Sequence, residues 1–147
     1  MSDDNSSFAG DVAVGEALDA LVREPQATLI DVRTEPEWQF VGGADLSDLG
    51  KEVVYLSWQV YPAMQIQPGY AERLGAELRR RGLSQDAPLY FLCRSGARSR
   101  SAAIEMTKAG WTHSYNVTDG FEGALDPERK RGRTGGWKAK GLPWRQS

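Results

Sequence analysis

The chain alternates between short apolar runs, which are typical of buried strands, and segments whose apolar residues recur at helical spacing. The apolar runs predict strands at residues 27–33, 52–58, 87–92 and 113–117. The helical spacing predicts helices at residues 14–22, 71–81 and 99–109, and a short helix that begins after Thr34. Because strands that alternate with helices form βαβ units, we expect an α/β fold. Its mostly parallel sheet should carry helices on both faces.

The length of 147 residues is enough for a single hydrophobic core. We therefore expect one domain over residues 11–147, preceded by a flexible tail at residues 1–10. The tail is acidic and polar and lacks the apolar segment of a signal peptide, which predicts a cytoplasmic protein. A single cysteine cannot form an internal disulfide, which agrees with a reducing compartment. No stretch has the character of a membrane span, so we expect no membrane partner.

The net charge of -2 conceals an uneven distribution along the chain. Residues 1–50 hold 11 acidic and 2 basic side chains, whereas residues 51–147 hold 9 and 16. A basic region can attract small anions, although charges scattered over solvated faces are an equally good interpretation. The basic segment ERKRGR is short and lacks interleaved aromatic residues. It therefore does not predict a nucleic-acid partner.

The candidate chemistry is concentrated in FLCRSGARSR, residues 91–100, which contains the only cysteine of the chain. Cys93 directly follows the most apolar predicted strand, and a helix is expected to begin a few residues later. Ligands of parallel α/β sheets bind beyond the carboxyl ends of the strands, so Cys93 occupies the position of an active site. Backbone N–H groups in such a loop can converge on an anion, and the following helix adds the positive end of its dipole.

Side chains of the loop point to the same chemistry. Gly96 permits a tightly curled backbone, and Ser95 and Ala97 are small. Arg94 and Arg98 add two permanent positive charges, which favour a thiolate. We therefore predict that Cys93 is a nucleophile near neutral pH. A buried structural cysteine is the commoner role of a lone thiol, but arginines are poor neighbours for an apolar side chain.

The loop CRSGARS resembles the active-site pattern C-x-x-G-x-R-[ST] of the rhodanese family, the thiosulfate:cyanide sulfurtransferases and their single-domain relatives. LIDVRTEPEW is similar to the family's N-terminal signature, and NVTDGFEGA and GGWKAKGLPW resemble later family segments. The usual Gly-His-Ile-Pro-Gly-Ala is replaced by VGGADLSDLG, and residues 46–70 and 126–135 are longer than in minimal members. These departures leave the choice of substrate open.

The resemblance implies a three-layer rhodanese-like fold with about five strands in the central sheet. It implies that Cys93 takes the outer sulfur of thiosulfate, or of a similar small anionic donor, as a persulfide. The sulfur then passes to cyanide or to a thiol, which includes a thiol on an acceptor protein. No metal and no organic cofactor is required. The substrate-binding residues that the resemblance implies are those of the loop: Arg94, Ser95, Gly96, Ala97, Arg98 and Ser99.

Two alternatives remain open. Cysteine phosphatases and arsenate reductases can share this fold, but their loops resemble C-x5-R, whereas four residues separate Cys93 from Arg98. A phosphatase also needs a general acid, and residues 93–100 contain no acidic side chain. A rhodanese-like binding or regulatory module is the other alternative, although such modules often lack the cysteine that this chain retains.

Three polar residues outside the loop are further candidates. Asp31 and Arg33 end a predicted strand whose carboxyl edge should face the loop. Asp31 can anchor a loop arginine or backbone amides, and a structural role is an equally good interpretation of both residues. His113 is the only histidine and is better explained as a structural or surface side chain. With one histidine and one cysteine, we expect no protein-only metal site.

Overall fold

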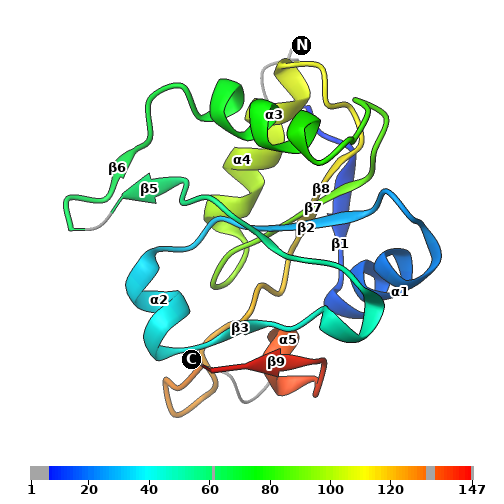
Figure 1. The fold of residues 1–147 in the computed structure, drawn as a ribbon. Helices are drawn as coiled ribbons and strands as arrows, with labels where there is room; N and C mark the ends of the chain where they lie inside the picture. Colours follow the sequence, from blue (N-terminus) through cyan, green and yellow to red (C-terminus); the bar gives the residue numbers. More distant parts are fainter. Residues whose placement is uncertain (1–6, 61, 132–134, 147) are drawn as a thin grey trace.

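The computed structural model describes residues 7–60, 62–131 and 135–146, and its core is one parallel sheet (Figure 1). The five strands lie in the order β1 (Gly10–Val12), β8 (Ser114–Val117), β7 (Leu89–Leu92), β2 (Thr28–Asp31) and β4 (Val54–Tyr55). Each neighbouring pair is parallel. The predicted α/β fold with a central sheet of about five strands is confirmed.

Helices cover both faces of this sheet. They are α1 (Val14–Arg23), α2 (Glu35–Phe40), α3 (Tyr70–Arg80), α4 (Ala97–Lys108), α5 (Gly136–Ala139) and a 3-10 turn at Ser47–Leu49. Residues of α3 and α4 pack in one core cluster, and those of α1 and α5 pack in the other. Figure 1 shows α3 at the top of the view, α4 below it, and α1 on another side of the sheet.

The central strand β7 is an unbroken apolar run because the sheet is buried on both faces. Successive side chains of a strand point to opposite faces. In β7, Leu89 and Phe91 therefore join the cluster beneath α3 and α4, whereas Tyr90 and Leu92 join the cluster beneath α1. All four residues are buried. This packing is the physical reason why the strand pattern is so clear in the sequence.

Two small antiparallel pairs flank the central sheet and were not predicted. β3 (Gly43–Ala44) pairs with β9 (Trp144–Arg145), and β5 (Gln59–Val60) pairs with β6 (Gln65–Ile66). The β5–β6 hairpin extends away from the body of the molecule in Figure 1. β5 and β6 lie outside the core, whereas Ala44 of β3 is buried in the cluster beneath α1. Two-residue strands leave no periodic signal in a sequence.

Residues 8–10, which were predicted as part of a flexible tail, contact the folded domain. Ala9 N donates a hydrogen bond to Ser114 O over 2.9 Å, and β1 begins at Gly10. Phe8 packs against the core, and the guanidinium of Arg100 lies 5.2 Å from the centre of its ring. Residues 1–6 of the predicted tail lie outside the described residues. Among the residues that are described, no helix is both long and apolar enough to cross a membrane.

Candidate functional site

Cys93 lies immediately after β7 at the carboxyl edge of the sheet, as predicted from its place behind an apolar run. Its side chain is only 1% exposed, yet it forms part of the wall of a surface pocket of about 340 Å³. The other lining residues are Glu37, Gln59, Met64, Arg94, Ser95, Ala97 and Arg98. The sulfur is therefore nearly buried in the wall of a pocket that is open to solvent.

The backbone after Cys93 curls around the sulfur. Gly96 N donates a hydrogen bond to Cys93 Sγ over 3.1 Å. Gly96 has a φ of 110°, and a Cβ there would collide with the carbonyl oxygen of Thr118. Gly120, with a φ of 72°, approaches the carbonyl group of Arg94 equally closely. The loop and the segment after β8 are thus packed backbone to backbone, and glycine is required at both contacts.

Ser99 lies behind the sulfur at the start of α4, where it is fully buried. Its Oγ is 3.2 Å from Cys93 Sγ and 2.5 Å from Asn116 Oδ1. Asn116 Nδ2 in turn donates to Asp11 Oδ1 over 3.1 Å. Asn116 and Asp11 were not predicted as site residues. A polar residue inside a buried strand was the available signal for Asn116, whereas an exposed acidic residue such as Asp11 gives none.

The guanidinium of Arg98 lines the pocket, but its two terminal nitrogens are paired with the carboxylate of Glu37. Nη1 and Nη2 of Arg98 donate to the two carboxylate oxygens of Glu37 over 2.7 and 2.9 Å. Glu37 Oε1 also accepts from the backbone N–H of Thr34 over 3.1 Å, so it belongs to the N-terminal cap of α2. The ion pair joins α2, which follows β2, to the start of α4, which follows the neighbouring strand β7.

The electrostatics of this pair follow from its contacts. Burial raises the pKa of Glu37, but the Arg98 hydrogen bonds and charge, together with the Thr34 N–H, outweigh burial and lower that pKa to about 2. Burial lowers the pKa of Arg98, and the opposing effect of Glu37 raises it above its usual value. Both groups are therefore charged at neutral pH.

Arg94 differs from Arg98 in being exposed and open to a ligand. It lines the pocket, and no side chain of the described residues pairs with its guanidinium. Gln59 and Met64 come from the β5–β6 hairpin and form another wall of the pocket. They belong to segment 46–70, one of the two segments that are longer than in minimal rhodanese domains. Tyr61 of the same segment lies outside the described residues.

The predicted loop residues are thus brought together in two groups. Five of them line the pocket, and two are buried around the sulfur. The pocket group is Cys93, Arg94, Ser95, Ala97 and Arg98, and the buried group is Gly96 and Ser99.

Asp31 and Arg33 form a buried pair that lies outside the pocket lining. Arg33 Nη2 donates to Asp31 Oδ2 and to Gly42 O, each over 2.7 Å. Its guanidinium also lies 4.3 Å from the centre of the Phe121 ring. The partner of Asp31 is therefore Arg33 and not a loop arginine. The pair therefore connects the end of β2 to Gly42 and to Phe121. This contact is structural and lies outside the pocket.

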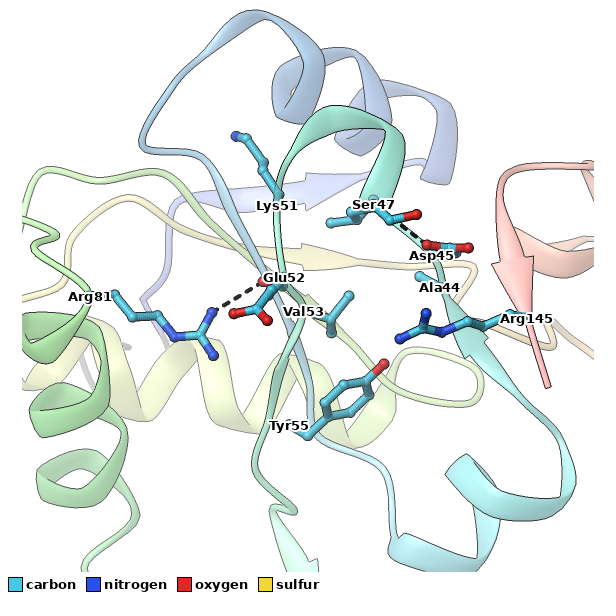
Figure 2. A pocket seen from close by; sticks show the side chains of 10 residues that line it. Ala44, Asp45, Ser47, Lys51, Glu52, Val53, Tyr55, Arg81 and Arg145 are labelled. Carbon is cyan, nitrogen blue, oxygen red and sulfur yellow. Dashed lines mark hydrogen bonds between the residues drawn. The ribbon is translucent and has the colours of Figure 1, made fainter. Parts of the chain in front are cut away.

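A second pocket, of about 370 Å³, runs beside β4 and the 3-10 turn (Figure 2). Figure 2 shows charged side chains of both signs around it, among them Asp45, Arg81 and Arg145. Arg81 already donates to Glu52 O over 3.2 Å, and Asp45 accepts from Ser47 N over 3.0 Å. None of its lining residues comes from the Cys93 loop. Within the described ranges, no group of three or more His, Cys, Asp or Glu residues is arranged to hold a metal ion.

Comparison with known proteins agrees with this fold. A crystal structure of the protein Rv0390 from M. tuberculosis superimposes with a TM-score of 0.83 at 50% identity, over 96% of this chain and 100% of that one. An uncharacterised protein of Rickettsia conorii is 36% identical over 129 residues, which are 88% of this chain and 91% of that protein. The polysulfide-sulfur transferase of Wolinella succinogenes shares the fold, with a TM-score of 0.59 at 22% identity over 97% of this chain and 82% of its own.

The family model of the rhodanese-like domain matches residues 14–126, which include β2, the Cys93 loop and all of α4 and β8. This match spans most of the chain and contains the loop whose pattern suggested the resemblance. The chain belongs to the rhodanese-like domain family.

Proposed function

We propose that this protein is a sulfurtransferase in which Cys93 carries sulfane sulfur from a small anionic donor, such as thiosulfate, to cyanide or a thiol. The acceptor thiol belongs to a small molecule or to an acceptor protein. One observation carries the proposal. The only cysteine of the chain lines an open pocket at the carboxyl edge of β7, with the Gly96 N–H 3.1 Å from its sulfur. Family membership supports this type of reaction.

The reaction has two steps. The Cys93 thiolate attacks the outer sulfur of thiosulfate, a new S–S bond forms, the old one breaks, and sulfite leaves with the electron pair. Cyanide or a thiolate then attacks the terminal sulfur of the persulfide and releases Cys93 as a thiolate again. The product with cyanide is thiocyanate, and the kinetics are ping-pong. The Gly96 N–H stabilises negative charge on the sulfur in both steps.

The two pocket arginines take different parts in this proposal. Arg94 is exposed and open to a ligand, so it binds the anionic donor. Arg98 is held by Glu37 and shapes the wall on which the donor rests. The near-complete burial of the sulfur restricts attack to groups that fit the 340 Å³ pocket.

Phosphate-ester hydrolysis is a poorer fit to the same pocket. The leaving group of such a reaction needs a general acid. The carboxyl group in the described lining is that of Glu37, whose pKa of about 2 leaves it ionised at neutral pH. The fork of Arg98, which would clamp two phosphate oxygens, is engaged by the same carboxylate.

Intact-mass spectrometry tests the proposal. Thiosulfate should add the mass of one sulfur atom to the wild-type protein, and cyanide should remove it as thiocyanate. Cys93→Ser should show neither change, because the chain has no second thiol. Aryl phosphates serve as a control substrate and should not be hydrolysed. If neither thiosulfate nor polysulfide adds sulfur to the wild type, the enzyme proposal fails and a binding module is the better explanation.

A further inference from the structure

A chain of polar side chains leads from the sulfur of Cys93 to the open edge of the sheet. Ser99 Oγ lies 3.2 Å from Cys93 Sγ and 2.5 Å from Asn116 Oδ1, and Asn116 Nδ2 lies 3.1 Å from Asp11 Oδ1. Ser99 is 0% exposed and Asn116 is 2% exposed. Asp11 is exposed on the edge strand β1, directly opposite Asn116 in the β1–β8 register.

The exposed carboxylate of Asp11 fixes the direction of every hydrogen bond in this series of side chains. A carboxylate only accepts hydrogen bonds, so the group of Asn116 that faces Asp11 must be the NH₂. The amide oxygen of Asn116 then faces Ser99, and an amide oxygen also only accepts. The single hydroxyl proton of Ser99 is therefore committed to Asn116.

This commitment decides what Ser99 offers to the sulfur. With its proton directed to Asn116, Ser99 Oγ presents only lone pairs to Cys93 Sγ. That arrangement suits a thiol, which donates its S–H to Ser99, and it disfavours a thiolate. Before Ser99 can donate to a thiolate it must turn away from Asn116, which leaves a buried amide oxygen without a donor.

We propose that Asp11 and Asn116 are positioning residues that hold the Ser99 hydroxyl away from the sulfur and so restrain the nucleophilicity of Cys93. Without the Asp11 carboxylate, the Asn116 amide is free to turn over and donate to Ser99 Oγ. Ser99 then donates its proton to the sulfur and favours the thiolate. This inference deepens the proposed function, because it rests on Cys93 being the reacting atom of that same site.

The inference predicts an increase in reactivity, which loss of a purely structural contact would not produce. The rate of Cys93 alkylation by iodoacetamide near neutral pH, followed by intact mass, measures nucleophilicity without any sulfur donor. Asp11→Ala should raise this rate about threefold to tenfold, the scale of one net hydrogen bond. Asp86→Ala is the matched control, since it removes the same charge from an exposed position before β7, at the opposite end of that strand from Cys93. It should leave the rate unchanged.

A double variant shows whether Asp11 acts through Ser99. In a Ser99→Ala background, Asp11→Ala should have no further effect on alkylation, because the hydroxyl that it releases is gone. If the increase persists in that background, Asp11 acts through its electric field and the relay is refuted. An unchanged or slower rate in Asp11→Ala alone also refutes it.

Sulfur loading of the same samples separates this inference from the proposed function. If the predicted alkylation pattern appears but thiosulfate adds no sulfur to the wild type, the relay stands and the sulfurtransferase proposal fails. If the wild type accepts sulfur but Asp11→Ala alkylates at the wild-type rate, the sulfurtransferase proposal stands and the relay fails.

Discussion

The ion pair between Glu37 and Arg98 should make the stability of this protein depend on pH in a way that one substitution reveals. The pKa of Glu37 is lowered from 4.5 to about 2 by the net effect of burial, Arg98 and Thr34. Each unit of such a shift corresponds to about 1.4 kcal/mol, so the full contribution to the free energy of unfolding is ~3 kcal/mol. Both side chains are less than a fifth exposed, at 17% and 18%, so solvent screening is limited.

The sign follows from a folded-state pKa that lies below the unfolded one. The stabilisation is fully present above about pH 4.5 and is lost as the pH falls towards 2. By pH 3 about 2 kcal/mol of it should be gone. Urea unfolding of the wild type and Glu37→Gln at pH 7 and pH 3 measures the change. The difference between the two proteins in free energy of unfolding should shrink by that amount at the lower pH.

A control for this experiment is provided by Glu77 on α3. Its pKa is also lowered to about 2, by hydrogen bonds from Arg80 and Arg81, but Arg80 is 71% exposed. Exposed ion pairs contribute little, because solvent and salt screen them. Glu77→Gln should therefore give a much smaller dependence on pH. If the gap between wild type and Glu37→Gln is equal at pH 7 and pH 3, the Glu37–Arg98 pair does not stabilise the fold and the reasoning is wrong.

Three further outcomes are expected. Arg94→Ala should raise the KM for thiosulfate about tenfold, the scale of one charge-assisted contact. Urea unfolding should not change, because the side chain is exposed. An unchanged KM would show that Arg94 does not bind the donor. Arg98→Lys should slow sulfite release in single-turnover assays about tenfold or more, because an ammonium cannot form the paired hydrogen bonds to both oxygens of Glu37. Release at the wild-type rate would contradict this prediction. Gly120→Ala should lower the free energy of unfolding by about 1–3 kcal/mol, because a Cβ at φ 72° meets the Arg94 carbonyl; unaltered stability would show that the loop yields freely.

The parallel sheet and the place of Cys93 could be predicted because their signals are local. A strand buried on both faces must be apolar throughout, and residues 89–92 satisfy that requirement without reference to the rest of the chain. The residue after such a strand lies at the carboxyl edge of the sheet, whatever the order of the strands. Cys93 was therefore located by its neighbours in sequence alone.

The surroundings of the loop could not be predicted in the same way, because they are long-range contacts. Glu37 and Arg98 are 61 residues apart, and Asn116 and Asp11 are 105 apart. Their pairing depends on the strand order β1-β8-β7-β2, which brings the ends of these strands together. The wall contributed by Gln59 depends on a hairpin of two-residue strands with no hydrophobic period. One sequence without strand order contains no signal for such contacts.

The contacts of the three loop arginines also explain how the uneven charge of the chain is used. Arg98 is neutralised by Glu37, a member of the acidic first 50 residues, and Arg100 lies over the ring of Phe8. Of the three, Arg94 is the cation that the pocket presents to a ligand among the described residues. A pocket with three unpaired arginines would attract any polyanion. In the proposed function, one unpaired arginine beside a buried sulfur favours a small anion whose reactive atom can reach that sulfur. If the proposed function holds, the ion pair restricts the anions that the loop can bind. It neutralises one positive charge of the pocket and fixes Arg98 in the pocket wall.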